Sequence, residues 1–287
     1  FTAQADDWGH AVVAFVRLQN FIRRGDEPRS RAMGRTASAA FRRLDDAWGL
    51  SAVLYHLGWG LKEFGRYAEA VPVLEQAIQV SSSAGVFNTA QWALSDLGVA
   101  LLALGETEAA TAAFTRAAAA SEEVGDAAGV VLAGLGRAQI AQIEGDAATA
   151  RPLFEEAVRG LTRLGTPLWG GHALAGVAWC DWREGLLDEA AGRYSDVHNA
   201  GRQYGEPTLI ASGLEGLARI AVSAGRRDEA QARLVEAAEL RQATARPAPP
   251  HEQAELRALS AQAAESVRLG APRAAVDLTE PGQLTPQ

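Results

Sequence analysis

Residues 97–117, LGVALLALGETEAATAAFTRA, contain the pattern that decides the fold. An apolar run ends at Gly105, and Ala110, Phe114 and Ala117 follow with spacings of four and three between them. Glycine directly after a helix adopts the left-handed conformation that ends the helix. Residues three or four positions apart lie on one helical face. The stretch therefore predicts two helices joined by a turn at Gly105.

This pattern repeats along the chain. Glycines recur every twenty residues, and the alternation of small and large apolar residues recurs every forty residues. The glycines of this series are Gly65, Gly85, Gly105, Gly125, Gly145, Gly165, Gly185, Gly205 and Gly225, and the register extends back to Gly25. Because alternating β-branched runs are absent, the repeat predicts an all-α fold, a solenoid of about six 40-residue helical hairpins. The small residues, such as Ala110 and Ala150, are expected where two helices cross closely.

The register predicts where the hairpins lie. We expect them at about 5–45, 48–84, 87–124, 127–164, 167–204 and 207–243. A proline-rich break at 245–250 precedes an amphipathic segment at about 251–269, which we interpret as a helix that caps the solenoid. Residues 1–270 are thus expected to form a single superhelical domain. The final segment, 271–287, has no helical period and is expected to be a disordered tail.

Composition excludes several classes of protein. The chain of 287 residues has a formal net charge of -8, so binding to nucleic acid or to an anionic membrane is not expected. Cys180 is the one cysteine, which excludes a disulfide framework. No apolar run approaches the length of about 18 residues that a membrane span needs. The chain begins at Phe1 without a signal-peptide pattern, so we expect a cytoplasmic location, and the absence of an initiator Met suggests a piece of a longer protein.

The spacing of small and large residues resembles that of a tetratricopeptide-repeat (TPR) array. The residues that match in two successive units are Leu57, Gly58, Leu61, Ala70, Leu74 and Ala77, then Leu97, Gly98, Leu101, Ala110, Phe114 and Ala117. TPR units usually span 34 residues, and HEAT repeats have a period nearer to the 40 residues found here. The small-residue positions nevertheless match the TPR pattern better. The resemblance implies a right-handed solenoid in which the first helix of each hairpin lines a concave surface.

That resemblance also implies which residues would face a ligand. The residues expected in the concave groove, where they would contact a ligand or partner, are Tyr55, Trp59, Lys62, Trp92, Asp96, Gln139, His172, Trp179, Trp182, Arg183 and Arg219. Four of them are tryptophans, which supply a large contact area at a low entropic cost. The alternative is that some of these rings pack between neighbouring helices. Trp8, Trp48 and Trp169 are set aside as a motif of the turns between repeats.

Two phrases, residues 44–50 (LDDAWGL) and 124–130 (VGDAAGV), are similar to repeats in a particular class of bacterial protein. They resemble the C-terminal repeat region of large multidomain signal-transducing (STAND) ATPases, including maltose-regulator-like transcription regulators. The resemblance implies a sensor module that regulates an ATPase or DNA-binding domain elsewhere in its own longer chain. Its partner would be a peptide, a protein segment or a small effector.

The sequence offers little for catalysis. The five histidines form no metal-binding pair of the HExxH type, and no phosphate-binding loop is present. We therefore expect a non-catalytic protein without cofactor or metal. Two alternatives remain: a scaffold or oligomerisation domain that associates through its convex face or its ends, and an enzyme built around His172, Asp181 and Arg183.

Overall fold

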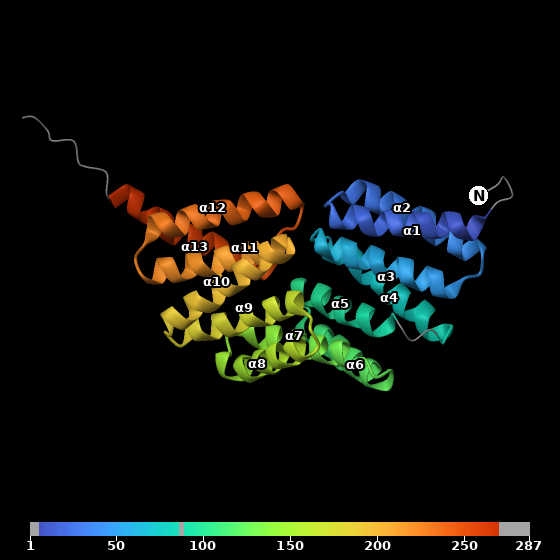
Figure 1. The fold of residues 1–287 in the computed structure, drawn as a ribbon, viewed down its shortest axis with the longest axis horizontal. Helices are drawn as coiled ribbons and strands as arrows, with labels where there is room; N and C mark the ends of the chain where they lie inside the picture. The colour runs from blue at the N-terminus through green and yellow to red at the C-terminus, as the bar shows by residue number, and fades with distance from the viewer. Residues whose placement is uncertain (1–5, 86–88, 270–287) are drawn as a thin grey trace, which may run out of the picture.

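The structure, a computed structural model, describes residues 6–85 and 89–269, and in these ranges it contains helices and no strand. The prediction of an all-α solenoid of six hairpins is confirmed (Figure 1). The helices are α1 (Asp7–Arg23), α2 (Glu27–Arg43), α3 (Ala47–Glu63), α4 (Tyr67–Ser83), α5 (Ala90–Ala103), α6 (Thr107–Glu123), α7 (Ala127–Ile143), α8 (Ala147–Arg163), α9 (Pro167–Arg183), α10 (Leu187–Tyr204), α11 (Pro207–Ser223), α12 (Arg227–Thr244) and α13 (Pro250–Leu269). The predicted tail, 271–287, lies outside the described residues.

Local chemistry sets both ends of these helices. At the start of α2, the Asp26 side chain accepts a hydrogen bond from the backbone N–H of Arg29 at 3.1 Å, which satisfies a donor that the helix leaves free. At the end of α5, Gly105 has a φ of 81°, a left-handed conformation that glycine adopts without a steric penalty. The same twenty-residue positions at 45 and 245 hold Asp45 and Ala245, both with a φ of 53°. The turn geometry therefore repeats even where the glycine does not.

Large residues on the second helices lie against small residues of their own hairpin or of the next one. Phe114, on α6, is 1% exposed, and a Cβ placed on Gly98 would lie 2.6 Å from its ring. A Cβ on Gly136, in the next hairpin, would also collide with this ring. Phe154 contacts Gly176 in the same way. The alanines expected at helix crossings are all fully buried: Ala70, Ala110, Ala150, Ala190 and Ala230.

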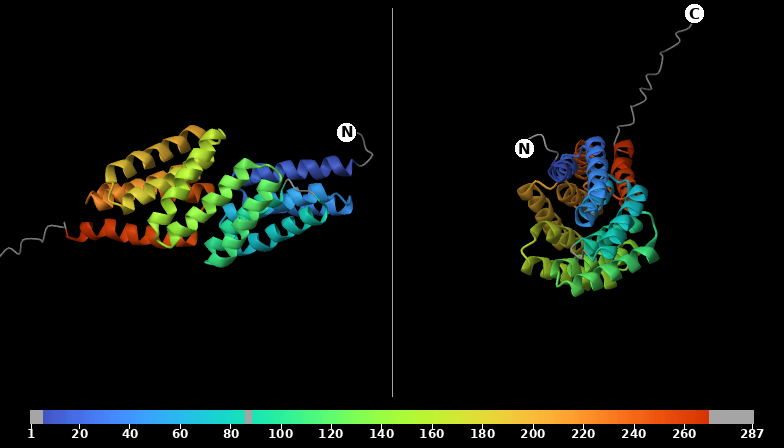
Figure 2. Two further views of the ribbon diagram at one scale, coloured as in Figure 1. Left: turned by 90° about the horizontal axis from the view of Figure 1, so that it is seen from below. Right: turned by 90° about the vertical axis from the view of Figure 1, so that its right-hand side faces the viewer.

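The hairpins form two layers around a superhelical axis. Each of the first helices, α1, α3, α5, α7, α9 and α11, packs against the first helix of the next hairpin, which makes them the inner layer. The second helices lie outside them, as the end view in Figure 2 shows. The array completes about one turn, so that α12 ends beside α1 and α2 (Figure 1). The capping role expected for α13 fits its packing on α11 and α12, where Leu259 and Ala263 are buried.

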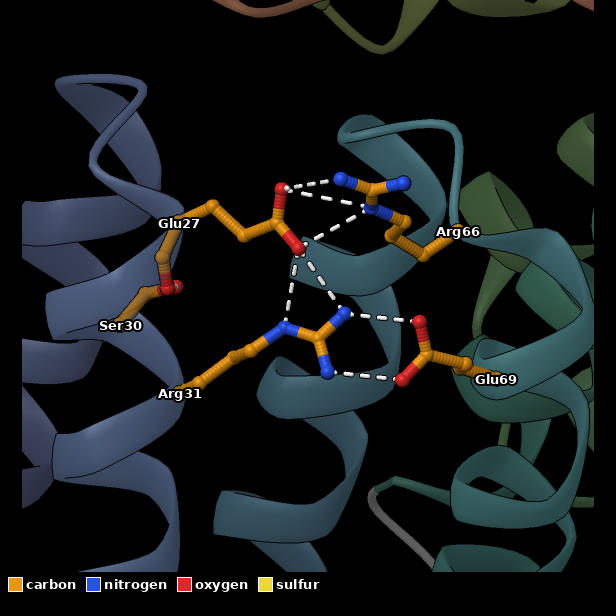
Figure 3. Close-up of polar contacts among 5 residues, drawn as sticks. All are labelled: Glu27, Ser30, Arg31, Arg66 and Glu69. Atoms are coloured by element: carbon orange, nitrogen blue, oxygen red, sulfur yellow. Dashed lines mark hydrogen bonds and ion pairs between the residues drawn. The ribbon is translucent and has the colours of Figure 1, made fainter.

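An ion-pair network joins the first two hairpins on the outer surface. Arg31 on α2 makes two hydrogen bonds to Glu69 on α4, at 2.7 and 2.9 Å (Figure 3). Glu27 accepts hydrogen bonds from Arg31 at 2.9 Å and from Arg66 at 3.1 Å. The hydrogen bonds from Arg31 lower the pKa of Glu69. These side chains are partly exposed, so their ion pairs contribute little to the free energy of folding. Their main effect is to fix the position of the second hairpin relative to the first.

Across the described residues, no helix combines the length and the apolar character that spanning a bilayer requires.

Candidate functional site

The residues predicted for the groove lie on α3, α5, α7, α9 and α11, and the fold separates them into two groups. One group, near the N-terminal end of the array, consists of Tyr55, Lys62 and Asp96. The other lines a cavity near the C-terminal end and consists of Gln139, Trp179, Trp182 and Arg183. Arg219 stacks on the Trp182 ring and so belongs to the second group. The concave surface therefore has a charged part and an aromatic part.

The charged part is built on Lys62, the one lysine of the chain. Its Nζ lies 2.7 Å from Asp96 Oδ1 and 3.1 Å from Glu63 Oε1, and its side chain is only 14% exposed. Burial alone would lower the pKa of Lys62, but the carboxylates of Asp96 and Glu63 overcome this effect and raise the pKa. Burial, together with the charge of Asp96, also raises the pKa of Tyr55 above its usual range. Lys62 is therefore a fixed positive charge between two carboxylates.

Glu63 has a second positive partner from the far end of the chain. Arg246, in the linker of residues 245–249 between α12 and α13, forms an ion pair with the other Glu63 oxygen. Burial alone would raise the pKa of Glu63, and the charges of Lys62 and Arg246 lower it instead. A segment near the other end of the chain thus contacts the charged part of the concave surface at Glu63.

The aromatic part surrounds a cavity of about 300 Å³. Its walls come from α5, α7 and α9 on one side and from the start of α13 on the other. The lining residues are Val99, Leu102, Ala103, Gln139, Gln142, Ile143, Gly145, Trp179, Trp182, Arg183, Pro249, His251, Glu252 and Glu255. This volume is at the lower end of the roughly 300–1,000 Å³ range of small-molecule sites. The cavity can hold a small molecule or one to two residues of a peptide.

Guanidinium groups hold the two tryptophans of the cavity in place. Arg183 lies over Trp179, with 5.7 Å between its Cζ and the ring centroid, and Arg219 lies 5.2 Å from the ring of Trp182. Trp182 Nε1 also donates a hydrogen bond to Ser223 Oγ at 2.9 Å. Stacked and hydrogen-bonded rings lose little entropy when a ligand binds. The aromatic wall is therefore preorganised.

Carboxylates line the α13 side of the cavity. Glu255 pairs with Arg219 at 2.9 Å, whereas the contacts of Glu252 are longer, 3.9 Å to Arg241 and 4.0 Å to His251 Nε2. Arg241 instead binds Glu215 at 2.6 and 2.8 Å. The side chain of Glu252 is 45% exposed where it lines the cavity, and the partial loss of solvation there, with the nearby charge of Glu215, raises its pKa to about 7. Glu252 can therefore gain or lose a proton near neutral pH.

The structure does not bring the other two predicted groove tryptophans to the cavity. Trp59 packs against the core of the first hairpins, with its ring 6.3 Å from His56. Trp92 contacts Trp169 at 5.3 Å between ring centroids. Trp59 therefore packs within the first hairpins, while Trp92 on α5 meets a ring from α9, two hairpins along the array. Of the turn motif, Trp8 reaches the next hairpin through a hydrogen bond from Nε1 to Asp46 at 3.1 Å, while about half of its surface stays exposed.

The residues of the enzyme alternative do not converge. Asp181 is 1% exposed and pairs with Arg151 at 2.9 Å and with Arg193, which lie on the outer helices α8 and α10. Arg183 points to Trp179 in the cavity. Burial lowers the pKa of His172, and the charges that act on its ring are those of Glu206, Glu63, Lys62 and Arg241. Burial also raises the pKa of Cys180 to about 11, so the thiol is a poor nucleophile near neutral pH.

No group of three or more His, Cys, Asp or Glu side chains in the described ranges is arranged to hold a metal ion.

Several residues of the concave surface could not be identified from the sequence. Glu252 and Glu255 occur in an amphipathic pattern in which charged residues are expected to face solvent, and Arg246 lies in a proline-rich break. Glu63 is adjacent to Lys62, so nothing in its spacing marks it as buried. Arg246, Glu252 and Glu255 reach the concave surface only because the linker and α13 pack against the first helices of the array, and no pattern in the sequence signals that path.

Comparison with known proteins supports the class that this architecture defines, an array of TPR-type helical hairpins. Residues 51–83, which span most of α3 and α4, match the family model described as Tetratricopeptide repeat. Among solved structures, a Rap protein in complex with Competence and Sporulation Factor is similar, with 12% identity and a TM-score of 0.58 over 82% of this chain and 78% of that one. BtubC from P. vanneervenii is similar with 14% identity and a TM-score of 0.53 over 86% and 95% of the two chains. A comparison with curated protein sequences found no match.

Proposed function

We propose that this protein is a non-catalytic binding module whose cavity takes a small effector or one to two residues of a peptide or protein segment. The cavity between α5, α7, α9 and α13, with the preorganised rings of Trp179 and Trp182, is the observation that carries the proposal. Gln139 and Gln142 add amide donors and acceptors that can fix the orientation of a ligand. The structurally similar Rap protein, solved with Competence and Sporulation Factor, provides a precedent for ligand binding on this kind of fold.

The biological setting follows from the sequence resemblance alone. We propose that the module is the regulatory part of a larger bacterial signalling or transcription regulator, in which ligand binding alters domains elsewhere in the same chain. The phrases at 44–50 and 124–130, each of which leads into an Ala/Leu-rich helix, support this setting. A P-loop ATPase or helix-turn-helix domain in the full-length gene product would test it directly.

Binding in the cavity can be tested by substitution. An array of tetrapeptides would first be screened, and the affinity of the strongest binder measured by calorimetry. Trp179→Ala with Trp182→Ala should weaken binding at least tenfold, because buried aromatic anchors dominate such interfaces. Gln139→Ala with Gln142→Ala, which removes less core packing, should also weaken it. Trp48→Ala, at a ring that is 49% exposed on the first turn of α3, is the matched control. Equal affinity for all variants contradicts the cavity assignment.

A second candidate function is association through an end of the solenoid. Val13 and Val16 on α1 are 48% and 47% exposed, whereas Val53, forty residues after Val13, is fully buried. The exposed face of α1 therefore has the apolar character of the equivalent face of α3, which is buried against the preceding hairpin. Light scattering tests this alternative: a dimer that Val16→Asp converts to monomer supports it, and a wild-type monomer at all concentrations contradicts it.

A further inference from the structure

The linker between α12 and α13 joins the two ends of the superhelical turn. Arg246 pairs with Glu63 across 183 positions of sequence, and Ala245 packs against the core cluster of the first hairpins. Arg246 is 8% exposed and Ala248 is 4% exposed, so these linker residues are as buried as many core residues. In Figure 1, α12 ends beside α1, α2 and α3, where these contacts are made. The linker therefore binds a surface of the first two hairpins as a ligand would.

The surface fits the linker closely at two turns. A Cβ on Gly65 would lie 2.6 Å from Cγ of Pro247, so the proline ring rests directly on the glycine backbone. A Cβ on Gly25 would lie 2.6 Å from the carbonyl oxygen of Thr244. At the other turn glycines in the described part of the chain, such as Gly105, a Cβ would meet nothing within 4 Å. Among these turn glycines, Gly25 and Gly65 are therefore the two that another part of the chain contacts closely, and in both cases the contact comes from residues at or next to the linker.

The negative charge of Glu63 favours an arginine, Arg246, beside the proline. Lys62 lies between Asp96 and Glu63, so one positive charge serves two carboxylates. The guanidinium of Arg246 supplies the second positive charge to the Glu63 oxygen that Lys62 does not contact. An arginine in this position is a charge-assisted donor to a buried carboxylate, which is a strong and directional contact. Glu63 and Gly65 together therefore match an arginine followed by a proline.

We propose that Glu63, Gly65 and Gly25 form a docking site for an Arg-Pro segment, that residues 244–248 fill this site as an internal ligand, and that a partner protein with an exposed Arg-Pro-Ala sequence binds here by displacing them. This site lies apart from the cavity of the proposed function. The two are connected, since Pro249, His251 and Glu252, directly after the internal ligand, form one wall of the cavity. Displacement of the linker is thus expected to open that wall.

The fold allows such a displacement without unfolding a helix. In a solenoid each hairpin contacts mainly its neighbours, so a small rotation at each interface separates the two ends. The covalent connection of the linker favours the docked state, because it keeps Arg246 near Glu63 at an effective concentration of about millimolar or higher. A partner therefore competes with the linker, and weakening the linker should expose the site.

The test supplies the internal ligand as a separate peptide. A labelled peptide with the sequence of residues 245–250, ARPAPP, is titrated by fluorescence anisotropy into the wild type and into Arg246→Ala with Pro247→Ala. The linker variant should bind the peptide at least tenfold more tightly than the wild type. Adding Glu63→Gln to the linker variant should lower that affinity at least tenfold, and a peptide with alanine in place of arginine should bind as weakly.

Controls keep the outcome unambiguous. Arg257→Ala removes an exposed arginine on α13 and should behave as the wild type. Arg246→Gln alone is a milder change, and circular dichroism reports whether each variant keeps its helices. A folded linker variant that does not bind the peptide, or that binds it equally well with Glu63→Gln, overturns the docking site. Neither result depends on Trp179 or Trp182, so failure here is distinct from failure of the cavity to bind a ligand.

Discussion

The buried ion cluster around Lys62 provides the most informative single substitution, Lys62→Met. Methionine keeps most of the side-chain volume and removes the charge. Asp96 and Glu63 would then be two buried carboxylates, with Arg246 as the one remaining cation in direct contact. Their mutual repulsion and lost solvation should destabilise the folded state.

The magnitude follows from the distances. With an effective dielectric constant of about 20, the attraction of Lys62 to Asp96 at 2.7 Å is about 6 kcal/mol and to Glu63 at 3.1 Å about 5 kcal/mol. The cost of removing these charges from water offsets most of that attraction in the intact cluster. When Lys62 is removed, the desolvation cost of Asp96 and Glu63 remains but the attraction that offset it is lost. We therefore expect the free energy of unfolding to fall by about 3–5 kcal/mol.

Urea unfolding followed by circular dichroism measures this loss, and its pH dependence identifies the cause. The pKa of Glu63 is lowered in the folded state, so its contribution to stability is present above about pH 4.3, the unfolded value, and is lost as the pH falls through the folded value. The pKa of Lys62 is raised, so its contribution is lost only at strongly alkaline pH. The difference between Lys62→Met and the wild type should therefore be larger at pH 7 than at pH 3.

Arg66→Met is the matched control, because Arg66 is 54% exposed and its ion pair with Glu27 is worth at most about 1 kcal/mol. The double variant Lys62→Met with Asp96→Asn should recover part of the lost stability, since it removes one orphaned charge. If Lys62→Met loses no more stability than Arg66→Met, or loses the same amount at pH 3 and pH 7, buried charge is not the cause.

Two further predictions concern packing and titration. Phe114→Ala should lower the free energy of unfolding by about 3–5 kcal/mol, because the ring is 1% exposed and fills the space between Gly98 and Gly136; a loss under about 1 kcal/mol in urea titrations contradicts this packing. Glu252→Gln should match the wild type in stability near pH 4.5 and exceed it at pH 8, because a carboxyl with a folded-state pKa of about 7 destabilises the fold once it ionises. Stability curves of the two proteins that stay parallel from pH 4.5 to pH 8 contradict the shifted pKa.

Much of the fold could be predicted from the sequence because the signals are local. The helix stop at Gly105 and the aspartate at the start of α2 act within one turn of a helix. The buried position of Ala110 follows from the forty-residue register. The division into inner and outer helices also follows from this register, because successive hairpins repeat the same packing on their neighbours.

The site was predictable only in part. Trp179 and Trp182 lie on the concave surface, as their register indicates, and they line the cavity. Trp59 and Trp92 have a similar register but do not line the cavity, since Trp59 packs against the core cluster of the first hairpins and Trp92 against Trp169. The register gives the face of a helix on which a side chain lies. What lies opposite that face depends on how far the superhelix closes.

The sequence by itself determined the hairpins, their order and their close crossings, since each depends on residues three, four or forty positions apart. Only the tertiary structure decided that the turn closes on itself, that Arg246 reaches Glu63 across 183 positions, and that Glu252 faces a cavity. The physical reason is that superhelical curvature is the sum of small rotations at successive interfaces. No single pair of residues encodes that sum, yet it decides which distant charges meet inside the superhelix.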